Sequence, residues 1–425
     1  MKNSLKFLFN LFFVFILISI LFSYAMFQGG FVSWFLFSGF LPIFVYHIGF
    51  LMYPIRNWQV SRSLSKKVVH AGESITVSIN LKRNIPFPIY YCLVEEVFSH
   101  SLNRLDNGQR KYESMNQPNN LKRDRKVKKA VLPWFNRNIE ITYTLDQIPR
   151  GKHSLQEIRV KTGDVFGFVK KEHIFQVEDE LFVHPKPLSV RNLHFLSNSE
   201  QGKLASEANH SVVNTNIAVG VREYEPGDRF TWIDWKQTAR KNTMMTKEFE
   251  QEKSSNILLA LDSCNNPSLN PLAFEGSIEL TLGLIEAFRK QHTRVNLITI
   301  TGKKGNNYFT LNKEVGLRNR VIEHLTTLQP TGMESFGLLL KEQMLRMNNG
   351  DIVFVMTTYM DETFKQTIDQ MSKRMKQVVV VFIQSSTLIT ESDRLTLHRF
   401  KREGIGTQII TEEKLVKKPI EVDIR

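Results

Sequence analysis

Two long apolar stretches open the chain. Residues 7–27 and residues 31–53 contain no Asp, Glu, Lys or Arg, and Gln28, Gly29 and Gly30 separate them. About 20 apolar residues in a helix span the ~30 Å hydrocarbon core of a bilayer, so each stretch predicts a transmembrane helix. A signal peptide is the alternative for the first stretch, but its apolar core is too long and no Ala-x-Ala cleavage site follows it. Residues 1–55 therefore predict a transmembrane helical hairpin.

The flanking charges predict how this hairpin is oriented. Lys2 and Lys6 precede the first stretch, Arg56 and Arg62 follow the second, and the connecting turn has neither Lys nor Arg. Because positive residues stay on the cytoplasmic side, we expect a two-span protein of the cell membrane whose soluble domains are cytoplasmic. Neither stretch offers a carboxylate to His47, so we interpret this histidine as a packing or interfacial residue and not as a proton relay.

The pattern changes to short alternating runs between residues 56 and 190. Apolar and polar residues alternate over 74–81, 138–145 and 155–161, and Gly- or Pro-containing turn signals separate the runs. Alternation with a period of two, repeated at this spacing, predicts a small antiparallel β-sandwich. The polar stretch from Asn103 to Lys129 predicts a long hairpin loop.

After residue 255, strands alternate with helices. Apolar runs at 257–262, 295–300, 351–358, 378–384 and 407–411 predict strands, and 308–311 predicts a strand that pairs with 295–300. Helical spacing appears over 274–289, 314–328, 335–347, from 361 onward and over 392–402. Such alternation predicts a mostly parallel sheet covered by helices on both faces, which we place at 256–425.

The charge balance indicates a polyanionic partner. The net charge is +14 at pH 7, and residues 54–140, directly behind the hairpin, hold 16 Lys or Arg against 7 Asp or Glu. This location favours an anionic lipid surface over nucleic acid, since the aromatic residues that stack bases are not interleaved with the charges. A solvated loop is the alternative interpretation. The predicted membrane-surface residues are Lys122, Arg123, Arg125, Lys126, Lys128 and Lys129.

No pattern of catalytic residues is recognisable. Two cysteines, Cys92 and Cys264, can form neither a disulfide framework nor a thiolate zinc site. The phosphate-binding loop, the Gly-x-Ser-x-Gly elbow and the His-Glu-x-x-His motif are all missing from the sequence. The Asp-x-Lys triplet at Asp234 is the form that some nucleases use, but Asp228 lies in a Pro-Gly turn and not on a neighbouring strand. We therefore predict a protein that is not an enzyme.

The segment at 191–255 connects the two predicted soluble domains and carries a distinctive motif. Over residues 220–240 it mixes two tryptophans with alternating charges and a Pro-Gly-Asp turn. We expect either a partly buried ionic network that docks the domains or a surface for a partner protein. The residues of this motif are Arg222, Glu223, Tyr224, Pro226, Gly227, Asp228, Ile233, Asp234, Trp235, Lys236 and Arg240.

The motif resembles the hallmark of the bacterial membrane-protein family catalogued as domain of unknown function 58. The paired spans, Ala71-Gly72-Glu73, Arg150-Gly151 and Asp164-Val-Phe-Gly167 agree with the resemblance, which covers nearly the whole chain. The resemblance implies a von Willebrand factor A-like domain at the C-terminal end. It also implies an association with MoxR-type AAA+ ATPases and, in some members, with transglutaminase-like membrane proteins.

The resemblance also raises the question of a metal site. Domains of the von Willebrand A type often hold Mg²⁺ through Asp-x-Ser-x-Ser, a threonine and a second aspartate. Here Asp262 is present, but Cys264 and Asn266 replace the two serines, and Thr357-Thr358 stands where the second aspartate is expected. Asp361 follows three residues later. A thiol is a poor ligand for Mg²⁺, so Asp262 is the one candidate metal residue, and we predict no resident cofactor.

These observations predict an α+β multidomain chain: a transmembrane hairpin, an antiparallel β-sandwich and an α/β von Willebrand factor A-like, Rossmann-like domain. The leading functional hypothesis is a membrane-anchored, cytoplasm-facing adaptor that works with a MoxR-type AAA+ ATPase on membrane or envelope complexes. The alternative is a ligand-binding domain of the adhesion type that needs a divalent metal at Asp262 and no ATPase.

Overall fold

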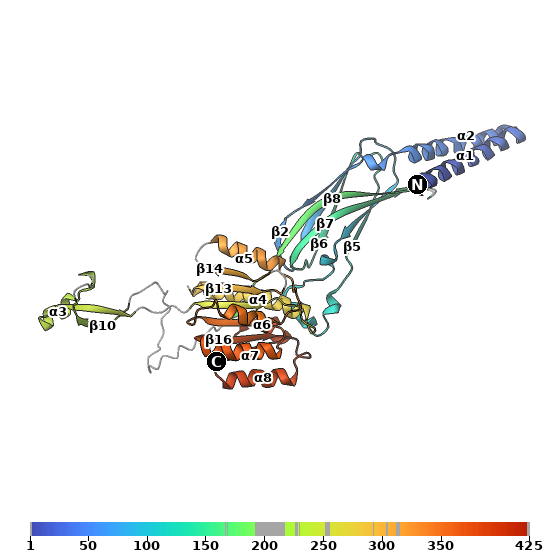
Figure 1. Cartoon of the computed structure of the whole chain (residues 1–425). Helices are drawn as coiled ribbons and strands as arrows, with labels where there is room; N and C mark the ends of the chain where they lie inside the picture. Colours follow the sequence, from blue (N-terminus) through green and yellow to red (C-terminus); the bar gives the residue numbers. More distant parts are fainter. Residues whose placement is uncertain are drawn as a thin grey trace. The chain divides into compact units, whose positions relative to one another are not determined.

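The computed structural model describes residues 2–165, 167, 169–191, 217–225, 228, 230–250, 256–291, 293–302, 305–311 and 315–422. The chain divides into two compact units (Figure 1). The first comprises residues 1–111 and 119–184, and the second comprises 112–118 and 185–425. The second unit thus includes seven residues that lie, in sequence, inside the first.

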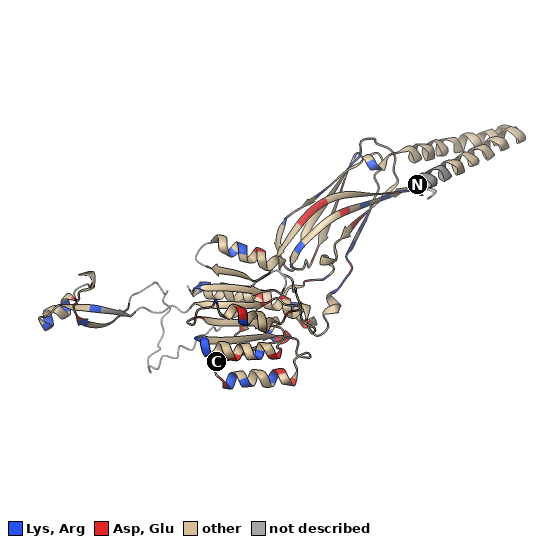
Figure 2. Ribbon diagram, viewed as in Figure 1, with Lys and Arg blue, Asp and Glu red and all other residues tan. Residues whose placement is uncertain are grey.

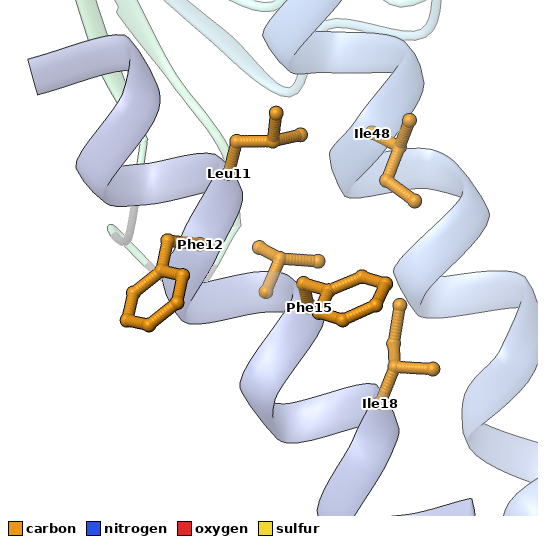
Figure 3. Close-up of a pocket in the computed structure, with 6 residues that line it drawn as sticks. Leu11, Phe12, Phe15, Ile18 and Ile48 are labelled. Carbon is orange, nitrogen blue, oxygen red and sulfur yellow. The ribbon is translucent and has the colours of Figure 1, made fainter.

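Two long helices begin the first unit, as the apolar stretches predict. Helix α1 runs over Lys2–Gln28 and α2 over Phe31–Met52, and both are long and apolar enough to cross a membrane. A pocket of about 350 Å³ lies against them and is lined only by apolar side chains, among them Leu11, Phe12 and Ile48 (Figure 3). An apolar lining is what a surface facing hydrocarbon requires.

Two β-sheets pack face to face behind the helices. Their strand orders are β1-β3-β6 and β2-β8-β7-β4-β5. The strands are β1 (Gln59–Leu64), β2 (Val68–His70), β3 (Ile75–Lys82), β4 (Tyr91–Phe98), β5 (Lys126–Val131), β6 (Asn138–Leu145), β7 (Gly151–Gly163) and β8 (Lys170–His184). Alternate residues of β3, such as Val77 and Ile79, are buried in one core with Val94, Ile158 and Val183 of the other sheet. The pairing is antiparallel except between β2 and β8, which run parallel.

The stretch predicted as a long loop is partly regular. Residues 103–129 contain the short 3-10 helices η3 (Gly108–Ser114) and η4 (Pro118–Leu121) and the first part of strand β5. A further 3-10 helix, η2 (His100–Leu102), precedes them, and η1 (Ile55–Asn57) follows α2. The loop prediction was wrong for the last part because β5 has charged residues on its exposed face, which hides the alternation.

The second unit contains a six-stranded sheet in the order β14-β13-β12-β15-β16-β17. Its strands are β12 (Ile257–Asp262), β13 (Val295–Ile300), β14 (Asn307–Leu311), β15 (Ile352–Thr357), β16 (Gln377–Ile383) and β17 (Gly406–Ile410). All neighbours pair in parallel except β14, which runs antiparallel along β13. In chain order this is the 3-2-1-4-5-6 arrangement of doubly wound folds, with β12 and β15 on either side of the reversal point.

Helices cover both faces of this sheet. Helices α6 (Phe336–Met344), α7 (Glu362–Arg374) and α8 (Glu391–Arg402) bury residues such as Leu340, Phe364 and Phe400 in one core with Leu258 and Val353. The long helix α4 (Pro271–Lys290) packs on the sheet through contacts such as that of Phe288 with Phe354, whose ring centroids are 5.3 Å apart. Helix α5 (Val315–Thr327), helix α9 (Glu412–Val416) and the short parallel pair of β9 (Val190–Arg191) with β18 (Ile420–Glu421) complete the unit.

Candidate functional site

The motif at 220–240 folds as a small separate module. Strand β10 (Ile217–Glu223) pairs antiparallel with β11 (Met245–Glu250) in a two-stranded sheet of its own, and 3-10 helix η5 (Phe230–Trp232) and helix α3 (Trp235–Lys241) lie between them. The sequence predicted this segment as a connection between domains. The structure gives it strands and helices, which we call the hairpin module (residues 217–225, 228 and 230–250 as described).

Asp234 organises the turn into α3. Its carboxylate accepts hydrogen bonds from the backbone N–H of Lys236 and Gln237, both at 3.1 Å, so it is the N-cap of this helix. The Thr238 hydroxyl donates to the Asp234 carbonyl at 2.9 Å and accepts from the Met245 N–H at 3.0 Å. Asn242 ends the helix in the left-handed conformation, a usual C-terminal stop. Asp234 therefore has a local structural role.

The Arg222 side chain pairs with Asp228 across the turn. Its guanidinium Nη2 lies 2.7 Å from the carboxylate Oδ1, while Oδ2 accepts the Glu225 N–H at 3.1 Å. These bonds to the Glu225 amide and to Arg222 hold the pKa of Asp228 below its usual value. The Arg222 side chain is more than a third exposed, so this is a surface pair. Pro226 and Gly227 lie outside the described residues.

The rest of the motif is largely at the surface. Ile233 is buried, but Trp235 is 66% exposed and Phe230, whose ring stacks near that of Tyr224, is 71% exposed. Glu223, Lys236 and Arg240 are exposed as well. Of the partly buried ionic network that the sequence predicts, the described residues show Arg222 paired with Asp228, with 38% and 12% of the two side chains exposed. The module's polar residues cap and brace a small scaffold that leaves aromatic and basic side chains accessible.

Asp262 ends strand β12 at the reversal point of the large sheet. Its Oδ1 accepts the Cys264 N–H at 2.9 Å, and its Oδ2 lies 2.7 Å from the Thr357 hydroxyl at the end of β15. Burial raises the pKa of Asp262 to about 7. Thr357 Oγ1 also lies 2.8 Å from the Tyr359 carbonyl, and its single proton cannot serve both oxygens. In its protonated form Asp262 donates to Thr357, which then donates to Tyr359; as a carboxylate it accepts the Thr357 proton.

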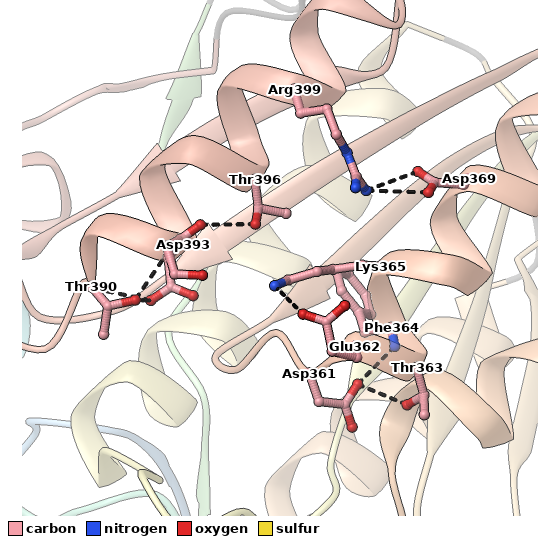
Figure 4. Close-up of polar contacts among 11 residues, drawn as sticks. Asp361, Glu362, Thr363, Phe364, Lys365, Asp369, Thr390, Asp393, Thr396 and Arg399 are labelled. Carbon is pink, nitrogen blue, oxygen red and sulfur yellow. Dashed lines mark hydrogen bonds and ion pairs between the residues drawn. The ribbon is translucent and has the colours of Figure 1, made fainter.

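The residues around Asp262 do not fit an Mg²⁺ site. Cys264 is buried, and burial raises its pKa so that it stays a thiol. Asn266, which replaces the second serine of the motif, lies 3.5 Å from the Thr358 hydroxyl through its amide nitrogen. Asp361 caps α7 by accepting the Phe364 N–H at 2.7 Å (Figure 4), and its charge is close enough to raise the pKa of Asp262 further. Within the described ranges no three His, Cys, Asp or Glu side chains are grouped to hold a metal.

His47 has a carboxylate partner that the sequence analysis missed. Its Nε2 lies 2.9 Å from Asp164 Oδ2 with both side chains buried, and its Nδ1 lies 2.8 Å from the Ile43 carbonyl. Asp164 follows β7 and also accepts the Val169 N–H. The two residues are 117 positions apart, so only the fold joins them. Lys171 fixes the same helix end by donating to the Leu51 and Tyr53 carbonyls at 2.9 and 2.6 Å.

The basic run, whose lysines and arginines are blue in Figure 2, lies on strand β5 and in the residues before it. Strand β5 pairs with β4 so that Val131 is opposite Cys92 and Lys126 is opposite Val97. The helix end lies at the Cys92 side, because the neighbouring Tyr90 packs against Tyr46 of α2. Lys122, Arg123 and Arg125 thus lie toward the end of the sandwich away from the helices. Arg125 donates to the Asp146 and Gln147 carbonyls, and Lys128 pairs with Glu95 at 3.0 Å. Lys126 and Lys129 continue the same strand.

Residues 112–118 form contacts that the sequence analysis did not predict. The Tyr112 hydroxyl donates to Glu279 of α4 at 2.7 Å, and Asn270, the N-cap of α4, donates to the Met115 carbonyl at 2.7 Å. Tyr112 and Met115 are fully buried. Two apolar side chains in a polar stretch were the available signal. They indicate that this segment is part of the second unit.

Comparisons with known proteins decide the family. The family model described as "Protein of unknown function DUF58" matches residues 220–388. An "Uncharacterized protein YeaD" of Bacillus subtilis is 38% identical over 296 residues, which cover 68% of each chain. The chain belongs to the DUF58 family, as the resemblance of its motif indicated.

Solved structures add no argument. The PilB minor pilin of Streptococcus sanguinis aligns over 77% of this chain and 85% of its own, with 9% identity and a TM-score of 0.29. The CARDB domain of a Pyrococcus furiosus protein aligns over 30% of this chain and 92% of its own, with 10% identity and a TM-score of 0.18. Similarities this low carry no conclusion for this DUF58 protein.

Proposed function

We propose that this DUF58 protein is a membrane-anchored, cytoplasm-facing adaptor whose hairpin module binds a partner protein. The partner is a MoxR-type AAA+ ATPase acting on membrane or envelope complexes, and a transglutaminase-like membrane protein is a second possible member of the assembly. The α/β sheet is then a von Willebrand factor A-like domain that serves as scaffold. Two apolar helices support the anchor, and their flanking lysines and arginines support the orientation.

One observation carries the proposal: the hairpin module exposes its aromatic residues. Trp235 and Phe230 lie on the surface beside the exposed Lys236 and Arg240. Tryptophan, aromatic residues generally and arginine are the types that dominate the energetics of protein interfaces. A docking role accounts for this combination of exposed aromatic and basic side chains on one small module.

A pull-down with the full-length detergent-solubilised protein tests the proposal. The unmodified chain should recover the AAA+ ATPase in at least one nucleotide state, with ATP, with ADP or without nucleotide. Trp235→Ala should lower recovery about tenfold or more, since an interface hot spot is worth about 2 kcal/mol or more. Tyr308→Ala is the matched control, because Tyr308 is also a largely exposed aromatic residue of the second unit.

The outcomes are distinct. Recovery that is equal for Trp235→Ala and the unmodified chain would place the docking surface elsewhere. Failure to recover any AAA+ ATPase in every nucleotide state would reject the adaptor role itself. The alternative, a metal-dependent ligand-binding domain, has less support, because Asp262 is enclosed by Cys264 and Thr357. Calorimetric titration with Mg²⁺ or Mn²⁺ that shows binding lost in Asp262→Ala would revive it.

A further inference from the structure

An exposed apolar loop lies at the end of the sandwich from which the helices leave. The residues that connect β5 to β6 place Leu132, Trp134 and Phe135 at the surface with 77%, 52% and 61% of each side chain exposed. The Trp134 ring packs 4.9 Å from Tyr90, which in turn packs 5.8 Å from Tyr46 of α2. The loop is thus joined to the end of α2 by a chain of aromatic contacts, and Figure 1 draws the helix pair leaving this end of the first unit.

A buried arginine holds this loop in shape. The Arg83 side chain is almost completely buried, and its guanidinium donates to the carbonyls of Trp134 at 2.9 Å, of Phe87 at 2.9 Å and of Asn136. Trp134 itself has a φ of +44°, a left-handed conformation that costs energy in a bulky residue. A buried charge and a strained backbone therefore serve to keep apolar side chains pointing outward. A loop that merely connected two strands would need neither.

The charges around the loop match an anionic surface. Besides the buried Asp164, which pairs with His47, this end is formed by the segments 52–57, 82–90, 132–137 and 169–171, which contain no Asp or Glu. They carry Arg56, Lys82, Arg137 and Lys170, all exposed. Aromatic residues with basic neighbours are typical of the membrane–water interface, where aromatic rings sit at the level of the headgroups.

We propose that the loop of Leu132, Trp134 and Phe135 docks into the headgroup region of the bilayer in which α1 and α2 are embedded. The ligand is the anionic lipid surface, and the basic residues around the loop, not the run at 122–129, contact its headgroups. Insertion of the loop beside α2 fixes the sandwich at a set angle to the membrane. This inference rests on the proposed membrane anchor.

Quenching by brominated lipids tests the inference in the full-length protein. Single cysteines at Phe135→Cys and Leu132→Cys carry a fluorescent label, and the chain is reconstituted into phosphatidylcholine–phosphatidylglycerol vesicles with bromine near the headgroup end of the acyl chains. The native Cys92 and Cys264 are buried, and mock labelling of the unmodified chain measures their background. Leu41→Cys, inside α2, is the control for the anchor. Asn107→Cys is an exposed control at the opposite end of the sandwich.

We expect loss of fluorescence at both loop sites and at Leu41→Cys, and none at Asn107→Cys. Quenching at Leu41→Cys without quenching at either loop site would overturn the inference and leave the anchor intact; the loop would then face a protein or solvent. Quenching at none of the sites would reject the anchor, and the inference with it. Quenching at Asn107→Cys as strong as at the loop would also overturn it, because contact would not be confined to the helix end.

Discussion

The sandwich interior and the hairpin module use the same types of charged residue in opposite ways. In the sandwich, Arg62 and Glu96 are completely buried, with Nε and Oε1 2.7 Å apart. Arg62 also donates to the Leu155 and Val177 carbonyls at 3.0 and 2.8 Å, and the Tyr143 hydroxyl donates to Glu96. In the module, Arg222 and Asp228 form an equally short pair, but the arginine is partly in solvent.

The comparison shows that the distance between two charged groups does not tell how much the pair contributes to stability. A buried pair must stay complete, since removing one partner leaves an uncompensated charge in a medium that cannot solvate it. A surface pair contributes little to stability because water solvates both partners well. The sandwich charges are therefore structural, whereas those of the module can change partners at little cost to the fold.

Among the predictions that test this comparison, Glu96→Ala is expected to have the largest effect on stability. The substitution removes the nearer carboxylate from the buried Arg62, which keeps Asp179 Oδ2 at 3.4 Å, and should lower the free energy of unfolding by up to about 3–5 kcal/mol. Chemical denaturation of the full-length protein in detergent measures it. Glu95→Ala is the control, because Glu95 pairs with Lys128 and Lys161, whose side chains are 57% and 35% exposed, and its loss should cost about 1 kcal/mol or less. Equal losses in the two variants would contradict the structural assignment of the buried pair.

A second effect concerns pH and Asp262. Its pKa is 3.8 in the unfolded chain and about 7 in the fold, so below pH ~4 the residue is protonated in both states. As the pH rises from 4 to 7 the unfolded chain releases its proton first, and the free energy of unfolding falls. Each pKa unit between the folded and unfolded values corresponds to about 1.4 kcal/mol, so the free energy of unfolding falls by at most roughly 4 kcal/mol.

Asp262→Asn should remove this dependence, because an amide mimics the neutral acid: it accepts from Cys264 and donates to Thr357. The full-length protein is denatured in urea, and proteolysis detects the unfolding of the second unit. The variant should be more stable than the unmodified chain at pH 8 and similar to it at pH 4. A variant that is less stable at pH 8 would mean that the fold stabilises the charged carboxylate, with a folded-state pKa well below 7, which is the state a metal ion would require.

The strands and helices of the second unit could be predicted well from the sequence. The bounds of β12 and β13 are those that the apolar runs gave, and β6 was placed equally well in the sandwich. Fully buried or strictly alternating strands have patterns that only one structure explains. Strand β8 was missed because it is rich in charged residues and most of its side chains stay partly exposed. Its sequence therefore does not show one clearly apolar face.

The site was harder to predict, because its geometry depends on residues far apart in the chain. The sequence located Asp262 at the end of a strand, but only the fold brings Thr357 to it and makes Asp361 the N-cap of α7. Likewise, Asp164 belongs to a recognised sequence landmark, yet its bond to His47 joins a strand end to a helix inside an apolar stretch. The spacing of a motif shows which residue types are present. Which side chains they contact depends on how the fold brings distant segments together.

The smallest effects are expected in the hairpin module, and Asp234 is the most informative residue there. Asp234→Ala removes an N-cap that satisfies two N–H groups of α3, which typically costs about 1 kcal/mol. Asp234→Ser should retain most of the cap and is the matched control. Arg222→Ala should cost less than Asp234→Ala, since its pair with Asp228 is a surface pair.

Hydrogen exchange of the α3 amides measures the cap directly, and the ATPase pull-down on the same variants measures docking. A loss of docking that follows the loss of the cap in Asp234→Ala, and returns in Asp234→Ser, would show that α3 must be helical to present Trp235. If Arg222→Ala instead unfolded the module completely, the exposed pair would be structural after all, and the contrast with the sandwich would fail.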